Sequence, residues 1–126
     1  MDDDEPLPAE IKRFILTSID SVTHLEALLL IRHDPNCEWD ASMIAQKLFL
    51  SEKKAADLLL NLYESGFIAP CTSKPSFFQY LPRSSELEEM TSRLSKDYGK
   101  YLIEITNLIH SKIDKQAQQL GDAFKW

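Results

Sequence analysis

The stretch from residue 37 to residue 80, CEWDASMIAQKLFLSEKKAADLLLNLYESGFIAPCTSKPSFFQY, decides the predicted fold. Its first part favours a helix that begins at Asp40, because an aspartate side chain accepts a hydrogen bond from the free N–H groups of a first helical turn. Apolar residues then recur at helical spacing, which places Ile44, Ala45 and Leu48 on one face. This part therefore predicts a short amphipathic helix over residues 40–48.

A second helix and a pair of strands complete the stretch. Ser51 is a favourable N-cap, and Gly66 suits the end of the helix because glycine adopts the left-handed conformation at little cost. The runs 67–69 and 77–80 are rich in apolar and aromatic residues, and the polar, proline-containing loop 70–76 separates them. The two runs therefore predict a short antiparallel pair of strands.

The order helix, tight turn, helix and two-stranded wing resembles the winged helix-turn-helix of bacterial transcription regulators, especially the MarR and PadR kinds. The resemblance covers nearly the whole chain at the level of element order. It implies that the second helix, over residues 51–65, is offered to the major groove of double-stranded DNA. It also implies that a long helix after the wing makes a homodimer.

The flanking segments predict helices on both sides of this stretch. Pro8 suits the first turn of a helix that runs to Asp20, and residues 21–32 form a second, mostly apolar helix. After the wing, residues 85–112 predict a long helix whose apolar rows alternate spacings of four and three, a pattern typical of a seam between two helices. The candidate dimer interface comprises Leu87, Leu94, Tyr98, Tyr101, Ile105 and Leu108.

These elements predict a mostly α fold with a small β-wing, that is, a winged helix-turn-helix plus a long C-terminal helix. The chain has 126 residues, of which 44% are hydrophobic, and this is enough for one core. We expect an acidic, mobile N-terminus (residues 1–7) and a winged helix-turn-helix domain (8–83). The long dimerisation helix and a short C-terminal helix follow (84–126).

Neither a membrane span nor a signal peptide is expected. The longest apolar run, Ala27–Ile31, is far shorter than the roughly 18–20 residues that cross a bilayer. The chain opens with Met1 and four acidic residues, where a signal peptide has a basic and then an apolar segment. We therefore expect a cytoplasmic protein, in which Cys37 and Cys71 stay reduced.

No catalytic or cofactor-binding motif stands out. The three glycines are scattered singly, so there is no glycine-rich phosphate loop. His24, His33 and His110 lie far apart, and no Cys-x-x-Cys pair occurs, so no metal site is predicted. The sequence predicts a protein that is not an enzyme and that has no cofactor.

The second helix and the wing supply the candidate DNA contacts. Periodicity turns Ala56 and Tyr63 toward the core together with Ala55, Leu59 and Leu62, and the polar residues outward. The helix N-terminus favours phosphate, Asn61 suits adenine, and a lysine suits guanine or phosphate. The candidate DNA-binding residues are Ser51, Lys53, Lys54, Asn61 and Lys74. The plain alternative is that they form the solvated face of an ordinary helix.

The charge balance opposes this interpretation. The chain carries 20 acidic against 14 basic residues, a net charge of −6, whereas DNA-binding surfaces are commonly basic. Residues 37–83 contain five of each sign and are neutral. Two hypotheses therefore stand. The first is a homodimeric, DNA-binding transcription regulator. The alternative is an acidic winged-helix module or adaptor that binds a protein partner without binding DNA.

Overall fold

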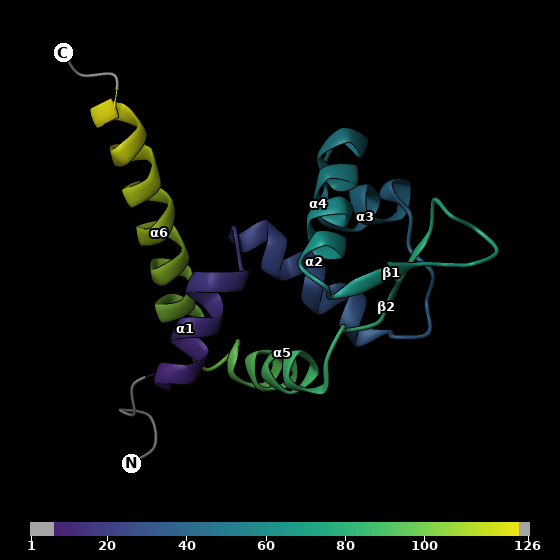
Figure 1. The fold of residues 1–126 in the computed structure, drawn as a ribbon, viewed down its shortest axis with the longest axis horizontal. Helices are drawn as coiled ribbons and strands as arrows, with labels where there is room; N and C mark the ends of the chain where they lie inside the picture. Colours follow the sequence, from purple (N-terminus) through teal and green to yellow (C-terminus); the bar gives the residue numbers. More distant parts are fainter. Residues whose placement is uncertain (1–6, 124–126) are drawn as a thin grey trace. The chain divides into compact units, whose positions relative to one another are not determined.

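The computed structural model describes residues 7–123, with side chains described as far as residue 113. This part of the chain is mostly helical with one small antiparallel sheet, which confirms the coarse fold class predicted above (Figure 1). The elements are α1 (Ala9–Ser18), α2 (Val22–His33), α3 (Ala41–Leu48), α4 (Glu52–Glu64), β1 (Ile68–Pro70), β2 (Phe78–Tyr80), α5 (Ser85–Asp97) and α6 (Leu102–Ala123).

The chain divides into two compact units. Among the described residues, the first combines residues 7–22 with residues 92–123, and the second comprises residues 23–91. The division falls inside α5. It groups α1 with α6, which is distant in sequence, instead of with the helices that follow α1 directly.

In the first unit, α1 packs against α6. Ile11, Phe14 and Ile15 are buried on α1, and Ile105 and Ile109 are buried on α6. Their spacings of three and four residues put each set on one helical face. The unit is thus a helix pair with an apolar contact, as the amphipathic pattern of both segments requires.

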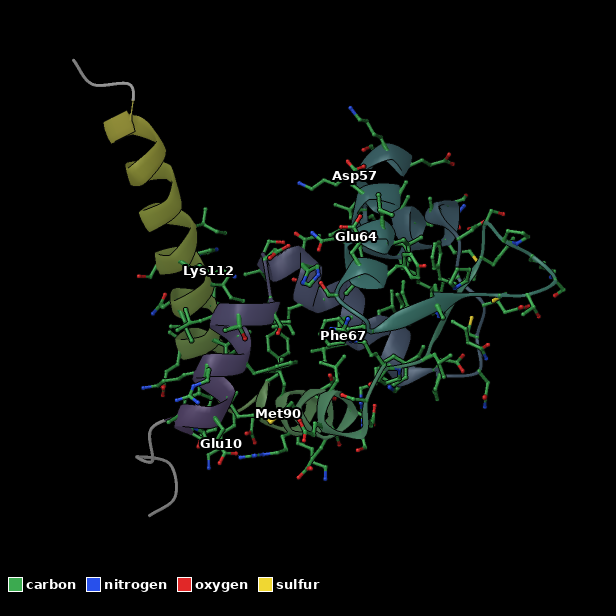
Figure 2. All side chains as sticks on the ribbon, viewed as in Figure 1. Glu10, Asp57, Glu64, Phe67, Met90 and Lys112 are labelled. Atoms are coloured by element: carbon green, nitrogen blue, oxygen red, sulfur yellow. The ribbon has the colours of Figure 1, made fainter. Side chains whose placement is uncertain are left out.

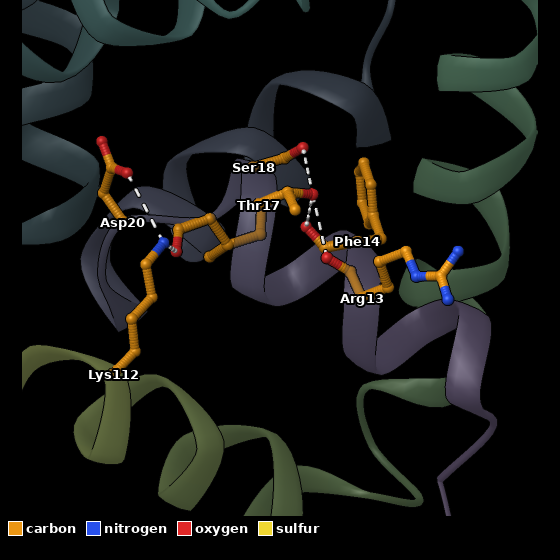
Figure 3. Close-up of polar contacts among 7 residues, drawn as sticks. Arg13, Phe14, Thr17, Ser18, Asp20 and Lys112 are labelled. Atoms are coloured by element: carbon orange, nitrogen blue, oxygen red, sulfur yellow. Dashed lines mark hydrogen bonds and ion pairs between the residues drawn. The ribbon is translucent and has the colours of Figure 1, made fainter. Parts of the chain in front are cut away.

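Polar contacts fasten the end of α1 to α6. The Lys112 ammonium group donates a hydrogen bond to the carbonyl oxygen of Ile19 (2.9 Å), and its Nζ lies 3.9 Å from the Asp20 carboxylate (Figure 3). The Thr17 hydroxyl donates to the carbonyl oxygen of Arg13 within α1 (2.9 Å). Because Lys112 satisfies a carbonyl at the C-terminal end of α1, it also complements the negative end of that helix dipole.

The prediction of one continuous helix over residues 85–112 is wrong. Helix α5 ends at Asp97, residues 98–101 form a turn, and α6 begins at Leu102. Gly99 lies in that turn, and glycine costs roughly 1 kcal/mol in a helix interior. The break frees α6 to change direction and pack on α1. Helix α6 then continues to Ala123, through the place where a separate short helix was predicted.

In the second unit, both predicted caps of the central helix pair are present. The Asp40 carboxylate accepts from the backbone N–H of Met43 (2.9 Å), and the Ser51 hydroxyl oxygen accepts from that of Lys54 (3.1 Å). Helices α3 and α4 pack against each other, with Ile44 fully buried between them and the rest of the unit. The helix-turn-helix order predicted from the sequence is therefore observed as two capped, packed helices.

The small sheet follows α4. Strands β1 and β2 pair antiparallel, with Ile68 opposite Tyr80 and Pro70 opposite Phe78. Trp39 adds a bridge on the other side of β2, because its backbone N–H and C=O exchange two hydrogen bonds of 2.7 Å with Phe78. The loop 71–77 joins the two strands, and its position matches the predicted wing loop.

The corner between α4 and β1 depends on Gly66. Its φ of +87° lies in the left-handed region, and an added Cβ would meet the Arg83 guanidinium at 2.8 Å. The Gly66 N–H donates to the carbonyl of Tyr63 (3.0 Å), and its own carbonyl accepts from the Arg83 N–H (2.8 Å). Glycine is therefore required by the backbone conformation, whereas the exposed Arg83 side chain can move away from an added Cβ.

We predict that Gly66→Ala destabilises the chain by about 1–2 kcal/mol, because alanine pays the left-handed penalty at this corner. Chemical denaturation monitored by circular dichroism measures the change. Gly99→Ala is the matched control, since a Cβ there meets nothing within 4 Å. Equal loss of stability in both variants would contradict the role assigned to Gly66.

Candidate functional site: the exposed face of helix α4

Helix α4 buries one face and exposes another that is apolar and acidic. Ala55, Leu58, Leu59 and Leu62 are buried in the second unit. Ala56 and Tyr63, which periodicity placed toward the core, are instead exposed, and so is Leu60. Figure 2 shows Asp57 and Glu64 on the same helix, and both are exposed. Not all apolar residues of α4 therefore belong to the buried face of the helix.

Four of the five candidate DNA contacts lie together. Ser51, Lys53, Lys54 and Asn61 line a shallow depression of about 350 Å³ along α4, and Asp57 and Leu58 line it too. Both lysines are exposed, whereas the Ser51 hydroxyl is engaged as the helix cap. The depression therefore combines two cations with one carboxylate.

Lys74 lies apart from that depression, in the loop between the strands. Its ammonium group is 3.8 Å from the Glu38 carboxylate and lies over the ring of Phe77, 5.3 Å from its centroid. The ion pair offsets part of its charge. The loop between the strands thus presents a lysine that is already paired with an acidic residue.

A second depression, which we call the α4 groove, was not predicted from the sequence. It has a volume of about 370 Å³ and lies between the start of α3, the exposed side of α4 and strand β2. The signal that could have revealed it is the triplet Leu58-Leu59-Leu60, because three consecutive apolar residues cannot all face one core from a helix. The lining residues are Asp40, Ala41, Ser42, Glu52, Ala56, Leu59, Leu60, Ser76 and Phe78.

Phe49, in the turn between α3 and α4, is the most unusual residue of this surface. Its φ is +57°, in the left-handed region, and its side chain is 94% exposed. A bulky residue in this conformation is strained, and an exposed phenyl ring gains nothing from burial. Stability alone would favour glycine here, so Phe49 is a candidate for a contact with another molecule.

We predict that Phe49→Gly stabilises the isolated chain by about 1 kcal/mol, through relief of the left-handed strain. Phe49→Ala is the control, because it removes the same ring but keeps a Cβ in the strained conformation. Thermal unfolding compares the three chains. If both variants changed stability equally, the strain would not be the cause.

The candidate dimer residues are largely covered within one chain. Leu94, Tyr101 and Ile105 are buried, and Leu87, Tyr98 and Leu108 are half-buried. The apolar side chains left most exposed around the start of α6 are Leu102 and Ile103 instead. The homodimer interface stays a prediction.

Polar chemistry in the second unit serves the fold. The Tyr80 hydroxyl on β2 donates to the Glu88 carboxylate on α5, and Glu88 also pairs with Arg32 on α2 at 3.3 Å. Burial, followed by the Glu88 hydrogen bond and charge, raises the pKa of Tyr80 above its ordinary value. This cluster links three elements and moves the ionisation of the Tyr80 phenol further into the alkaline range.

Neither cysteine has the environment of an activated thiol. Burial raises the pKa of the Cys37 thiol, with further contributions from Asp34 and Glu38. Burial and then Glu38 raise the pKa of the Cys71 thiol. A raised pKa lowers the fraction of reactive thiolate at neutral pH. Within the described side chains, no three His, Cys, Asp or Glu residues gather closely enough to hold a metal ion.

The Tyr80 environment predicts a specific alkaline behaviour. Because the folded-state pKa of Tyr80 is raised, its contribution to stability is complete below the ordinary value of 10.0 and is lost as the pH rises above it. We therefore expect the free energy of unfolding to fall more steeply between about pH 9 and pH 11 in the wild type than in Tyr80→Phe. Urea titrations across that range test this, with Tyr63→Phe, at an exposed tyrosine, as the control. Parallel pH profiles for wild type and Tyr80→Phe would refute the assignment.

Comparison of the chain with protein-family models, curated proteins and solved structures finds no match. Among the described residues, no single helix is both long and apolar enough to cross a bilayer, and α1 and α2 meet that standard only when they are taken together as a broken pair.

Proposed function

We propose that residues 23–91 form a winged-helix recognition module that binds a protein partner and has no catalytic role. The observation that carries the proposal is the exposed face of α4, where Ala56, Leu60 and Tyr63 lie among acidic residues. Exposed apolar side chains grouped on one helix are typical of a protein-binding surface. The strained, exposed Phe49 beside this helix supports the same conclusion.

Electrostatics favour a protein partner over DNA. Helix α4 contains three acidic residues (Glu52, Asp57 and Glu64) and two basic ones (Lys53 and Lys54), so its net charge is negative. DNA carries one negative charge per about 1.7 Å of its axis, and most binding affinity comes from neutralising it. The negative charge of DNA would repel a helix with carboxylates along its exposed face. An apolar protein surface would not repel it.

A DNA-binding, homodimeric transcription regulator is the second candidate. The specific observation in its favour is the pair Lys53 and Lys54, exposed at the capped N-terminus of α4. A helix N-terminus attracts phosphate, and two lysines there would add to that attraction. This candidate uses the start of α4, and the protein-binding candidate uses the exposed side of its middle and end.

Site-specific photo-crosslinking tests the proposal in the cells that make the chain. A p-benzoylphenylalanine residue at position 60 or 63 should give a discrete adduct with one other protein, whereas the same probe at exposed Glu89 on α5 should not. The partner, identified by mass spectrometry and purified, should bind the wild type and lose about tenfold or more in affinity with Leu60→Asp, as expected for a central interface residue.

DNA retention provides the opposing outcome. At low salt the wild type should not retain fragmented genomic DNA, because the α4 face carries a net negative charge. Salt-sensitive retention that disappears in the double variant Lys53→Glu, Lys54→Glu would overturn the protein-binding proposal. It would establish the second candidate instead.

A further inference from the structure

We propose that the α4 groove docks an amphipathic helical segment of the partner whose apolar side chains are flanked by lysine or arginine. This inference deepens the proposed function and rests on it. The volume of about 370 Å³ lies at the lower end of the roughly 300–1,000 Å³ range of ligand sites. It is sized for a few side chains of a docked segment.

The floor of the groove is apolar. Ala56, Leu59 and Leu60 of α4 line it together with Phe78 of β2, and Leu60 remains 52% exposed. Covering such side chains contributes about 25 cal/mol per Å² of apolar surface removed from water. Burial of Leu60 by a partner would contribute most to the binding free energy, since half of its surface is still in water.

The rim of the groove is acidic, which sets the charge of the occupant. Asp40 and Glu52 line it, one at the start of α3 and one at the start of α4. A helix N-terminus carries only about half a positive charge, whereas each carboxylate carries a full negative charge. The carboxylates therefore outweigh the two helix dipoles. A segment with cations beside its apolar face complements this rim, and an acidic one does not.

The backbone of the groove wall favours a helix over an added strand. Phe78 lies between two neighbours: it is paired with Pro70 of β1 on one side, and its N–H and C=O both bond to Trp39 on the other. Its backbone groups are thus already engaged, so strand addition at this point would gain no hydrogen bonds. A partner must instead bind through side chains, as an amphipathic helix does.

Two synthetic peptides test the inference with the full chain. The first is a leucine–lysine amphipathic helix of about four turns, or about 14 residues, and the second has every lysine replaced by glutamate. Fluorescence anisotropy of the labelled peptides measures affinity at physiological salt. The lysine peptide should bind, and the glutamate peptide should bind at least about tenfold more weakly.

Matched variants locate the binding. Leu60→Asp should weaken the lysine peptide about tenfold or more, while Leu102→Asp, which alters a similarly exposed leucine on α6, should not. Glu52→Gln should weaken it about two- to fivefold. Glu86→Gln is the charge control, because Glu86 occupies the first turn of α5 as Glu52 occupies that of α4.

The outcomes separate this inference from the function on which it rests. If Glu52→Gln and Glu86→Gln weakened the binding equally, the net charge of the chain alone would explain the binding, and the inference would be overturned. Preference for the glutamate peptide, or an unchanged affinity in Leu60→Asp, would also overturn it. After any of these three outcomes, a partner crosslinked at position 60 would still support the protein-binding function. A wild-type dimer that Leu60→Asp dissociates would assign the groove to a second copy of the chain.

Discussion

The left-handed corner at Gly66 is the constraint on which the second unit depends. Directly after α4 the chain must turn back so that β1 and β2 lie beside that helix, and the turn is closed by hydrogen bonds from Gly66 to Tyr63 and from Arg83 to Gly66. Phe67, the next residue, is fully buried and donates its N–H to the carbonyl of Leu62. The corner therefore determines where the sheet lies relative to α4, and the α4 groove exists only because of that placement.

The first unit follows from a different constraint, the need of two amphipathic helices for apolar cover. Helix α1 has a buried apolar face, and α6 packs against it. The turn at residues 98–101 makes this packing possible, and Lys112 donates a hydrogen bond to the carbonyl oxygen of Ile19 at the end of α1. The apolar rows that resemble a seam between two chains are thus mostly satisfied within one chain.

The surface of α4 shows why a fold does not determine a function. The helices, the caps and the small sheet of the second unit match the sequence prediction, but the exposed side chains of α4 are leucine, tyrosine, alanine and carboxylates, with Lys53 and Lys54 near its start. A reading helix needs donors and cations to contact bases and phosphates, and on α4 these are Lys53 and Lys54 near its start and Asn61 near its end. The remainder of that face is apolar and acidic.

The sequence by itself determined the local elements of the second unit. Asp40 and Ser51 marked the starts of α3 and α4, and Gly66 marked the end, because capping and left-handed turns depend on residues that are adjacent in the chain. The four-and-three repeat after residue 85 was correctly read as helical, although its break at Gly99 was missed. A single glycine is tolerated in many helices, so its effect depends on what lies beyond it.

Only the tertiary structure decided which apolar residues were left uncovered. Periodicity assigned Ala56 and Tyr63 to the core and gave no sign of the strained Phe49 or of the α4 groove. It also assigned Tyr101 and Ile105 to a partner chain, whereas both are buried within this one. The physical reason is that periodicity states which face of a helix is apolar, but burial depends on which distant element reaches that face. Helix α6 covers the apolar face of α1, whereas Leu60 stays 52% exposed.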